Sequence, residues 1–301
     1  MSKIITAEEL SPYYIAYQHE RHEHPEKYHL ISSGLRDLNG IIGGGYEAGQ
    51  YVGIAGTEKA GKTTLLVEHL DSMAQRGNNV AMFSNEMRDM QIGNMLFSMY
   101  TKIERTRIRA LGLEIADWKP MEIAGEAIAK LTLSFDFGTF DIDDVPSAIR
   151  EIEVKTGEKV KVIGADYFHL FDDPDFRGSR VDQLSSNSLK FKRLTNLDNI
   201  PRLVLLAVHL NREASKANLI ASNFFLGTGQ LERDFDIGLI ISRIKDPLGT
   251  NDEFLPFARK ISVVLSRETD IGDCNVFFNG ATATLADLAD ESGRPPRRSW
   301  E

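Results

Sequence analysis

Residues 56–63 read GTEKAGKT, which fits the phosphate-binding pattern GxxxxGK[ST]. In such a loop, backbone N–H groups surround a phosphate at the positive end of the following helix. An apolar, strand-like run at 51–55 precedes the loop and a helical pattern at 62–76 follows it. The sequence therefore predicts a nucleotide site made of Gly56, Thr57, Glu58, Lys59, Ala60, Gly61, Lys62, Thr63 and Thr64.

Two side chains of this loop have separate tasks. Lys62 is expected to contact the β- and γ-phosphates, and the Thr63 hydroxyl to ligate Mg²⁺. The metal also needs a carboxylate, and the buried run VKVIGAD ends in Asp166. An aspartate at a strand end is often only a cap, but the loop upstream favours a metal-binding role. ATP and Mg²⁺ are the expected cofactors.

Hydrolysis also requires a group that activates water. The predicted strand 80–84 leads directly into Asn85-Glu86-Met87. Ligands of doubly wound sheets bind at the carboxyl ends of the strands, so Glu86 is expected to face the phosphate loop. It is the candidate general base, although its position alone leaves a solvent-exposed glutamate at a helix start equally open.

Short β-branched runs alternate with longer helical stretches along the chain. This alternation predicts an α/β fold with a mainly parallel central sheet flanked by helices. The expected strands are 50–55, 80–84, 160–166, 203–208, 237–242 and 261–266. The expected helices are 62–76, 89–101, 118–130, 146–156 and 181–197.

Composition excludes several classes of protein. The 301 residues are 42% hydrophobic and 26% charged, as in ordinary globular domains. The net charge of −9 argues against a protein that coats nucleic acid by bulk charge, though not against a local basic channel. A single cysteine, Cys274, excludes an internal disulfide. With no signal sequence and no membrane-spanning run, we expect a cytoplasmic protein without membrane contacts.

The two ends differ from the middle. Residues 1–31 are polar and histidine-rich, with a short helical pattern at 7–17, and are expected to form an arm or linker. Residues 286–301 are rich in Pro and Arg and are expected to be a disordered tail, which leaves 32–285 as the ATPase domain. The arm contains histidines at the spacings found in metal sites: His19, His22, His24 and His29. No rigid scaffold supports a site there, so a solvated linker is favoured over zinc binding.

Together these motifs resemble the C-terminal ATPase domain of DnaB-like replicative helicases over about residues 33–279. Ser84-Asn85-Glu86-Met87 is similar to the family's SLEM, whose glutamate is the catalytic base, and 166–170 to its DYLQL. Further similar stretches are 33–39, 45–50, 108–118, 208–212 and 229–236. The resemblance implies a RecA-like P-loop NTPase core in a hexameric ring that translocates on single-stranded DNA as a replication helicase.

The resemblance also assigns two further catalytic residues beside Glu86 and Lys62. His209 stands where the family has a glutamine that senses the γ-phosphate, and a buried structural histidine is the alternative. Arg267 matches the arginine finger that reaches the γ-phosphate of a neighbouring subunit. The family's Lys-x-Arg is changed here, because Leu265 replaces the lysine.

Contacts to DNA are expected from the loops that follow the strands ending near 166 and 209. The candidate residues are Arg177, Arg180 and Lys216, with ordinary solvated loops as the alternative. Only about thirty residues precede the core, where full replicative members carry a helical domain, and 7–17 could dock on the next subunit. A primase, a loader or another replisome protein is a further candidate partner.

Two other functions stay open. One is a RecA- or RadA-like recombination ATPase that forms filaments on single-stranded DNA. The other is an ATP-gated replisome scaffold or loading partner without helicase activity. The DYLQL-like run favours a helicase, and the presence of Lys62, Asp166 and Glu86 argues against an inactive ATPase.

Overall fold

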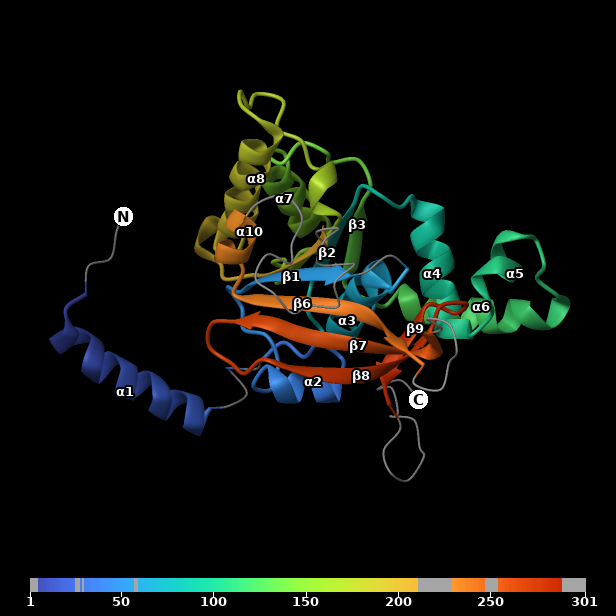
Figure 1. The fold of residues 1–301 in the computed structure, drawn as a ribbon, viewed down its shortest axis with the longest axis horizontal. Helices are drawn as coiled ribbons and strands as arrows, with labels where there is room; N and C mark the ends of the chain where they lie inside the picture. The colour runs from blue at the N-terminus through green and yellow to red at the C-terminus, as the bar shows by residue number, and fades with distance from the viewer. Residues whose placement is uncertain are drawn as a thin grey trace.

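The computed structural model describes residues 5–24, 28, 30–56, 59–210, 229–246 and 254–288. Within them the strands form one nine-stranded sheet in the order β3-β2-β4-β5-β1-β6-β7-β8-β9 (Figure 1). Pairing is parallel from β3 through β6 and antiparallel from β6 to β9. The predicted α/β fold with a mainly parallel sheet is confirmed.

The sequence located six of the described strands to within a few residues, except that β6 and β7 are longer than expected. These are β1 (Tyr51–Gly56), β2 (Val80–Ser84), β4 (Val162–Asp166), β5 (Leu203–His209), β6 (Ile237–Lys245) and β7 (Phe254–Ser266). It missed the edge strand β3 (Leu133–Asp136), together with β8 (Gly272–Asn279) and β9 (Thr284–Asp287). β3 has only four residues, all of them half-buried, and β8 alternates polar with apolar positions. Neither has the continuous apolar run that marked the central strands.

The helices flank the sheet in the positions that parallel crossovers require. The described α-helices are α1 (Ala7–Glu23), α2 (Arg36–Ile41), α3 (Lys62–Gln75), α4 (Asp89–Thr101), α5 (Arg105–Arg109), α6 (Ile115–Ile128), α7 (Val145–Thr156), α8 (Arg180–Leu194) and α10 (Gly229–Asp234), with 3₁₀ turns at Phe168–Leu170 and Leu197–Asn199. α7 has the boundaries expected from its proline and glycine, because Pro146 lies in its first turn and Gly157 ends it with φ of 75°. α6 begins three residues earlier than expected, because the Asp117 carboxylate accepts a hydrogen bond from the Glu114 N–H at 2.8 Å and so caps its first turn.

Two hydrophobic layers cover the two faces of the sheet. Alternate residues along each strand separate them: Val52 and Ile54 of β1 belong to one layer, and Tyr51 and Ala55 to the other. The first layer packs against α2, α3 and α4, and the second against α7, α8 and α10. The helices α5 and α6 pack on α4 rather than on the sheet.

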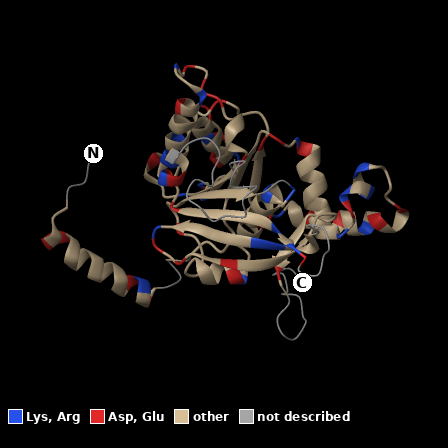
Figure 2. Cartoon of the chain, viewed as in Figure 1, with Lys and Arg blue, Asp and Glu red and all other residues tan. Residues whose placement is uncertain are grey.

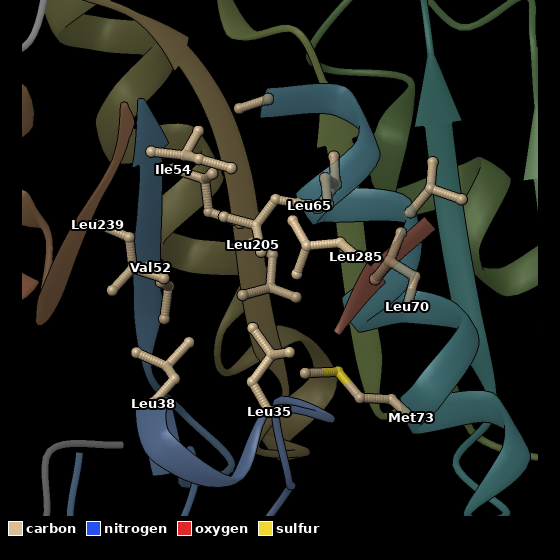
Figure 3. Packing of buried hydrophobic residues seen from close by; sticks show 14 of the residues in the cluster. Leu35, Leu38, Val52, Ile54, Leu65, Leu70, Met73, Leu205, Leu239 and Leu285 are labelled. Carbon is tan, nitrogen blue, oxygen red and sulfur yellow. The ribbon is translucent and has the colours of Figure 1, made fainter. Parts of the chain in front are cut away.

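α3 is the most deeply enclosed helix. Every residue from Thr64 to Ala74 is buried, and the helix contacts strands at both edges of the sheet, β3 and β9, as well as central ones. The sheet therefore curves around α3. Figure 3 shows the packing of three of its side chains, Leu65, Leu70 and Met73, against residues of β1, β5 and β9.

The last strand ties the C-terminal part of the sheet to α2. Both carboxylate oxygens of Asp287 accept hydrogen bonds from the first turn of α2, from the N–H of Arg36 at 2.8 Å and of Asp37 at 3.2 Å. Ala286 and Asp287, which the sequence assigned to the tail, thus belong to the sheet. Residues 289–301 lie outside the described part.

The N-terminal helix α1 extends away from this body (Figure 1). Thr6 and Glu9 form a reciprocal cap at its start, and none of its 17 residues is buried. The helix is six residues longer than the pattern at 7–17 predicted. No helix within the described ranges is long and apolar enough to cross a membrane.

Where α3 lies close to the sheet, the large side chain of Leu70 packs against Gly164, which has none. A Cβ added to Gly164 of β4 would lie 2.4 Å from Cδ1 of Leu70. We expect Leu70→Ala to lower the free energy of unfolding by about 2–5 kcal/mol by leaving a cavity, and Gly164→Ala to lower it by about 1–3 kcal/mol by overpacking. Urea unfolding of the double variant should give a loss smaller than the sum, whereas strictly additive losses would show that the two sites do not share one space.

Candidate nucleotide site

The sheet order brings the carboxyl ends of four parallel strands together. Gly56 at the end of β1 lies opposite His209 of β5, and Ser84 at the end of β2 lies opposite Asp166 of β4. β4 and β5 are themselves neighbours. The residues predicted to form the loop, the base, the metal ligand and the sensor therefore lie together at the carboxyl ends of the central parallel strands, as expected for an α/β ligand site.

The phosphate loop joins β1 to α3. Gly61 caps α3 with φ of 105°, in the left-handed region that favours glycine, and Lys62 is the first residue of the helix. Ala60 and Thr64 are buried, and Lys59 also has a positive φ, of 58°. The loop therefore ends at a helix N-terminus, as the sequence predicted. Thr57 and Glu58 lie outside the described residues.

Lys62 lies close to an aromatic ring and is affected by the charges of two carboxylates. Its Nζ is 4.9 Å from the centroid of the Tyr167 ring. Burial lowers the pKa of the ammonium group, while the charges of Asp166 and Glu86 oppose that shift. A desolvated cation in this position interacts more strongly with a phosphate than an exposed one does.

Asp166 is a buried carboxylate close to Lys62 and Thr63. It has no exposed surface, and neither side-chain oxygen has a hydrogen-bond partner within the described residues. Burial raises the pKa of the carboxyl to about 6, the charge of Lys62 lowers it and the charge of Glu86 raises it; the Thr63 hydroxyl, close by but outside hydrogen-bond geometry, lowers it least. Such a group is costly unless a cation completes it. The donor set of Asp166 and Thr63 fits Mg²⁺, which takes few protein ligands beside phosphates and water.

Glu86 is exposed at the mouth of this arrangement. The backbone N–H of Asn85 donates to the Asp166 carbonyl at 2.8 Å, and that of Glu86 donates to the same oxygen at 3.4 Å. These bonds fix the turn after β2 to the end of β4. The Glu86 carboxylate is close enough for its charge to act on the pKa values of Lys62 and Asp166, and it is open to water, as the predicted general base has to be.

His209 forms part of an aromatic cluster that sequence reasoning missed. Its ring lies 4.4 Å from that of Tyr167 and 5.4 Å from that of His169, between centroids. Burial, then the charges of Lys62 and His169, lower the pKa of His209 to about 4. The imidazole is therefore neutral near pH 7. The signal was the run Asp166-Tyr167-Phe168-His169-Leu170, but no sequence pattern shows that it meets the end of β5.

Arg267 lies at the opposite end of the sheet from its own phosphate loop. Its Nε donates to the Phe235 carbonyl at 3.1 Å and is 3.4 Å from the Asp236 carboxylate, and Nη2 donates to the carbonyl of Arg233. The Asp236 N–H donates to the carbonyl of Tyr51, at the amino end of β1. β1 has six residues, about 20 Å at roughly 3.3 Å per residue. Arg267 and Lys62 are thus not brought together within one chain.

The DNA-binding candidates have different surroundings. Arg177 is exposed and donates to the carbonyls of Pro174 and Phe176. Arg180 begins α8 and is engaged within the protein, because Nη2 donates to the His169 carbonyl at 2.6 Å and Nη1 is 3.5 Å from Asp172. Figure 2 shows basic and acidic residues mixed where this segment meets α8. Lys216 lies outside the described residues.

The histidine-rich arm forms no metal centre in the part of the chain that is described. No group of three or more His, Cys, Asp or Glu residues there could hold a metal ion. His29 lies outside that part, so the solvated-linker interpretation stays a prediction.

The family model described as the DnaB-like helicase C terminal domain matches residues 31–287 of this chain. Among curated proteins, none matches it.

Solved structures agree on the fold. A structure of a DnaB-like replicative helicase and its interactions with primase superposes with a TM-score of 0.76 at 20% identity, covering 87% of this chain and 64% of the other. The chain thus spans less than two thirds of that protein. The ATPase domain of G40P gives 0.80 at 21% identity, covering 92% and 98%. A KaiC-like protein from Pyrococcus horikoshii gives 0.56 at 15% identity, covering 86% and 98%. Together with the sheet described above, these similarities establish the predicted RecA-like P-loop core.

The neutral state of His209 has a consequence for stability. Its pKa is lowered from 6.5 to about 4, so between those pH values the unfolded chain binds a proton that the folded chain does not. The free energy of unfolding of the unaltered protein should therefore fall as pH falls through this window. Between pH 7.5 and pH 5 we expect His209 to account for a fall in the free energy of unfolding on the order of 1 kcal/mol, a value reduced because the ring is only half-buried. In His209→Gln this part of the fall should be absent.

The measurement is urea unfolding at both pH values. His22→Gln, on the exposed surface of α1, is the matched control and should keep the pH dependence of the unaltered protein. If His209→Gln and the control give parallel curves, His209 is not held neutral by its surroundings.

Proposed function

Because the chain belongs to the family of DnaB-like helicase C-terminal domains, we propose that it is an Mg²⁺-dependent ATPase that forms hexameric rings and moves along single-stranded DNA as a replication helicase. The observation that supports this most directly is the buried, unsatisfied carboxylate of Asp166 beside Lys62, with Thr63 close by. It is a site that a nucleotide-bound cation would complete.

The chain's own residues divide the chemistry among them. The loop N–H groups and the α3 N-terminus bind the phosphates, and Lys62 neutralises charge that develops on the transferred phosphoryl group. Glu86 takes the proton of the attacking water through its carboxylate. Bound Mg²⁺ would supply further neutralisation of phosphate charge, with Asp166 and Thr63 holding it. His209, neutral and close to Lys62, can donate one hydrogen bond to the γ-phosphate.

Two features support assembly of several subunits. Arg267 lies about 20 Å from the phosphate loop of its own chain, measured along β1, so a finger role requires the nucleotide of a neighbour. α1 has no buried residue and carries Leu10, Tyr14 and Ile15 exposed, apolar surface that a neighbouring subunit would cover. Both fit a ring in which α1 docks on the next subunit.

DNA contact is proposed for the loops that begin after β4 and β5. Arg177 is the described candidate whose side chain bonds only to its own loop, whereas Arg180 is engaged by His169 and Asp172. Lys216 remains a candidate from the second loop. A primase or loader is the proposed protein partner, by analogy with the solved helicase whose interactions with primase are known.

The function is tested by the hydrolysis of ATP with and without a single-stranded oligonucleotide. We expect the rate to rise with DNA and the DNA affinity to fall with salt, since phosphate contacts release counterions. Glu86→Gln should bind Mg-ATP normally but hydrolyse it roughly a hundredfold or more slowly, because it keeps the shape and loses the base. Glu126→Gln, an exposed position on α6, is the matched control.

A rate indifferent to DNA would favour the scaffold role over the helicase. Electron microscopy of the same mixture separates closed rings from the filaments of a recombinase. Loss of ATP binding in Glu86→Gln would mean that Glu86 holds the loop or the metal instead of activating water.

The finger assignment is tested by mixing two inactive variants. Arg267→Ala keeps its own loop and offers no finger, and Lys62→Ala does the reverse. Each alone should be nearly inactive, because a finger arginine supplies roughly a thousandfold or more in rate. Mixed rings should contain some interfaces with both groups intact and so recover part of the activity. No recovery, with subunit exchange demonstrated, would show that Arg267 does not act on a neighbour.

A further inference from the structure

Arg259 of β7 is a buried arginine bonded to the phosphate loop. Only 6% of its surface is exposed, and no carboxylate of the described residues lies within salt-bridge distance of it. Its Nε donates to the backbone carbonyl of Ala60 at 3.1 Å, and Nη1 donates to its neighbour Ala258 at 2.7 Å. One guanidinium group therefore joins β7 to a loop residue 199 positions earlier in the chain.

The same guanidinium group lies on an aromatic ring that contacts the next loop residue. Cζ of Arg259 is 4.2 Å from the centroid of the Phe278 ring, on β8. That ring packs so closely against Gly61 that a Cβ there would lie 2.5 Å from Cε2 of Phe278. Arg259 and Phe278 thus contact both residues of the Ala60–Gly61 peptide unit.

This placement is costly. Burial lowers the pKa of Arg259, and the charge of Arg243, which pairs with it across β6 and β7, lowers it further. The other deeply buried arginine, Arg202, is compensated by a carboxylate, because its Nη2 is 2.9 Å from Glu153. The described part of the chain offers Arg259 a ring and backbone carbonyls instead.

The stereochemistry of the peptide unit gives this contact a consequence. In a planar trans peptide the C=O and the N–H point in opposite directions. When the Ala60 carbonyl is directed to Arg259, the Gly61 N–H is directed away from it. Gly61 has φ of 105° and, lacking a Cβ, would otherwise allow this peptide to rotate readily.

We propose that Arg259, braced by Phe278, is a positioning residue that holds the Ala60–Gly61 peptide with its N–H available to a nucleotide phosphate and its carbonyl turned away. It touches no reacting atom and acts through the loop. The proposal rests on the proposed function for its ligand, a nucleoside triphosphate, but the ordering of the loop does not depend on any ligand.

Two variants test whether Arg259 and Phe278 hold the Ala60–Gly61 peptide. Arg259→Lys keeps the charge but loses the Nε–H and the planar face, and Phe278→Leu keeps an apolar side chain but loses the ring. In the nucleotide-free protein, hydrogen exchange of amides 59–63 should rise about tenfold in either variant. The Kd for Mg-ATP should rise about tenfold, the size of one hydrogen bond to a charged group, while kcat at saturation changes less than about threefold.

Arg202→Lys is the matched control, since it alters an equally buried arginine away from the loop. It should lower the Tm without changing loop exchange or the Kd for Mg-ATP. Unchanged loop exchange in Arg259→Lys, or equal changes in the Arg202 control, would overturn the proposal. If Arg259→Lys does not fold, Phe278→Leu decides by the same readouts. Failure of the unaltered protein to bind Mg-ATP would refute the nucleotide function. The comparison of hydrogen exchange would still show whether Arg259 and Phe278 hold the loop peptide in place.

Discussion

The burial of α3 is the constraint on which the rest of the structure depends. The helix is enclosed from Thr64 to Ala74, and strands from both edges of the sheet contact it, so it cannot shift without opening the core. Its first residue is Lys62. The position of the lysine, and of the helix N-terminus proposed to bind phosphate, is therefore set mainly by the packing of α3 in the core.

The charged groups of the site, unlike α3, are made less stable by their burial. Asp166 is placed without a hydrogen-bond partner among the described residues, and burial lowers the pKa of Lys62. Each would be more stable in water. The surrounding strands supply the stability that keeps these groups in place, because β4 pairs with neighbours on both sides. The ligand proposed here, a nucleotide with its cation, would bring a partner of opposite charge to each of these groups.

Local patterns in the sequence were sufficient for the central part of the fold. The loop and Glu86 follow continuous apolar strands and Asp166 is the last residue of one, and such strands can be recognised without tertiary information. The contacts of Arg259 with Ala60 and of His169 with His209 could not be predicted, because they join segments far apart in the sequence through the order of the strands. β8 and β9 were missed since their polarity alternates or their length is short. The finger assignment of Arg267 came from family resemblance alone.

β7 connects the two ends of the sheet at which nucleotide chemistry is proposed. Arg259, in the middle of the strand, bonds to the loop of its own chain, and Arg267 directly follows its carboxyl end. Between them Ile261 and Val263 are buried and pair with both β6 and β8, so this stretch is held as a rigid unit. If the chain forms the proposed ring, the Arg259 side chain would contact the phosphate loop of one site and the Arg267 side chain the γ-phosphate of the next. The two arginine side chains proposed to serve these sites would then be joined by the backbone of one strand.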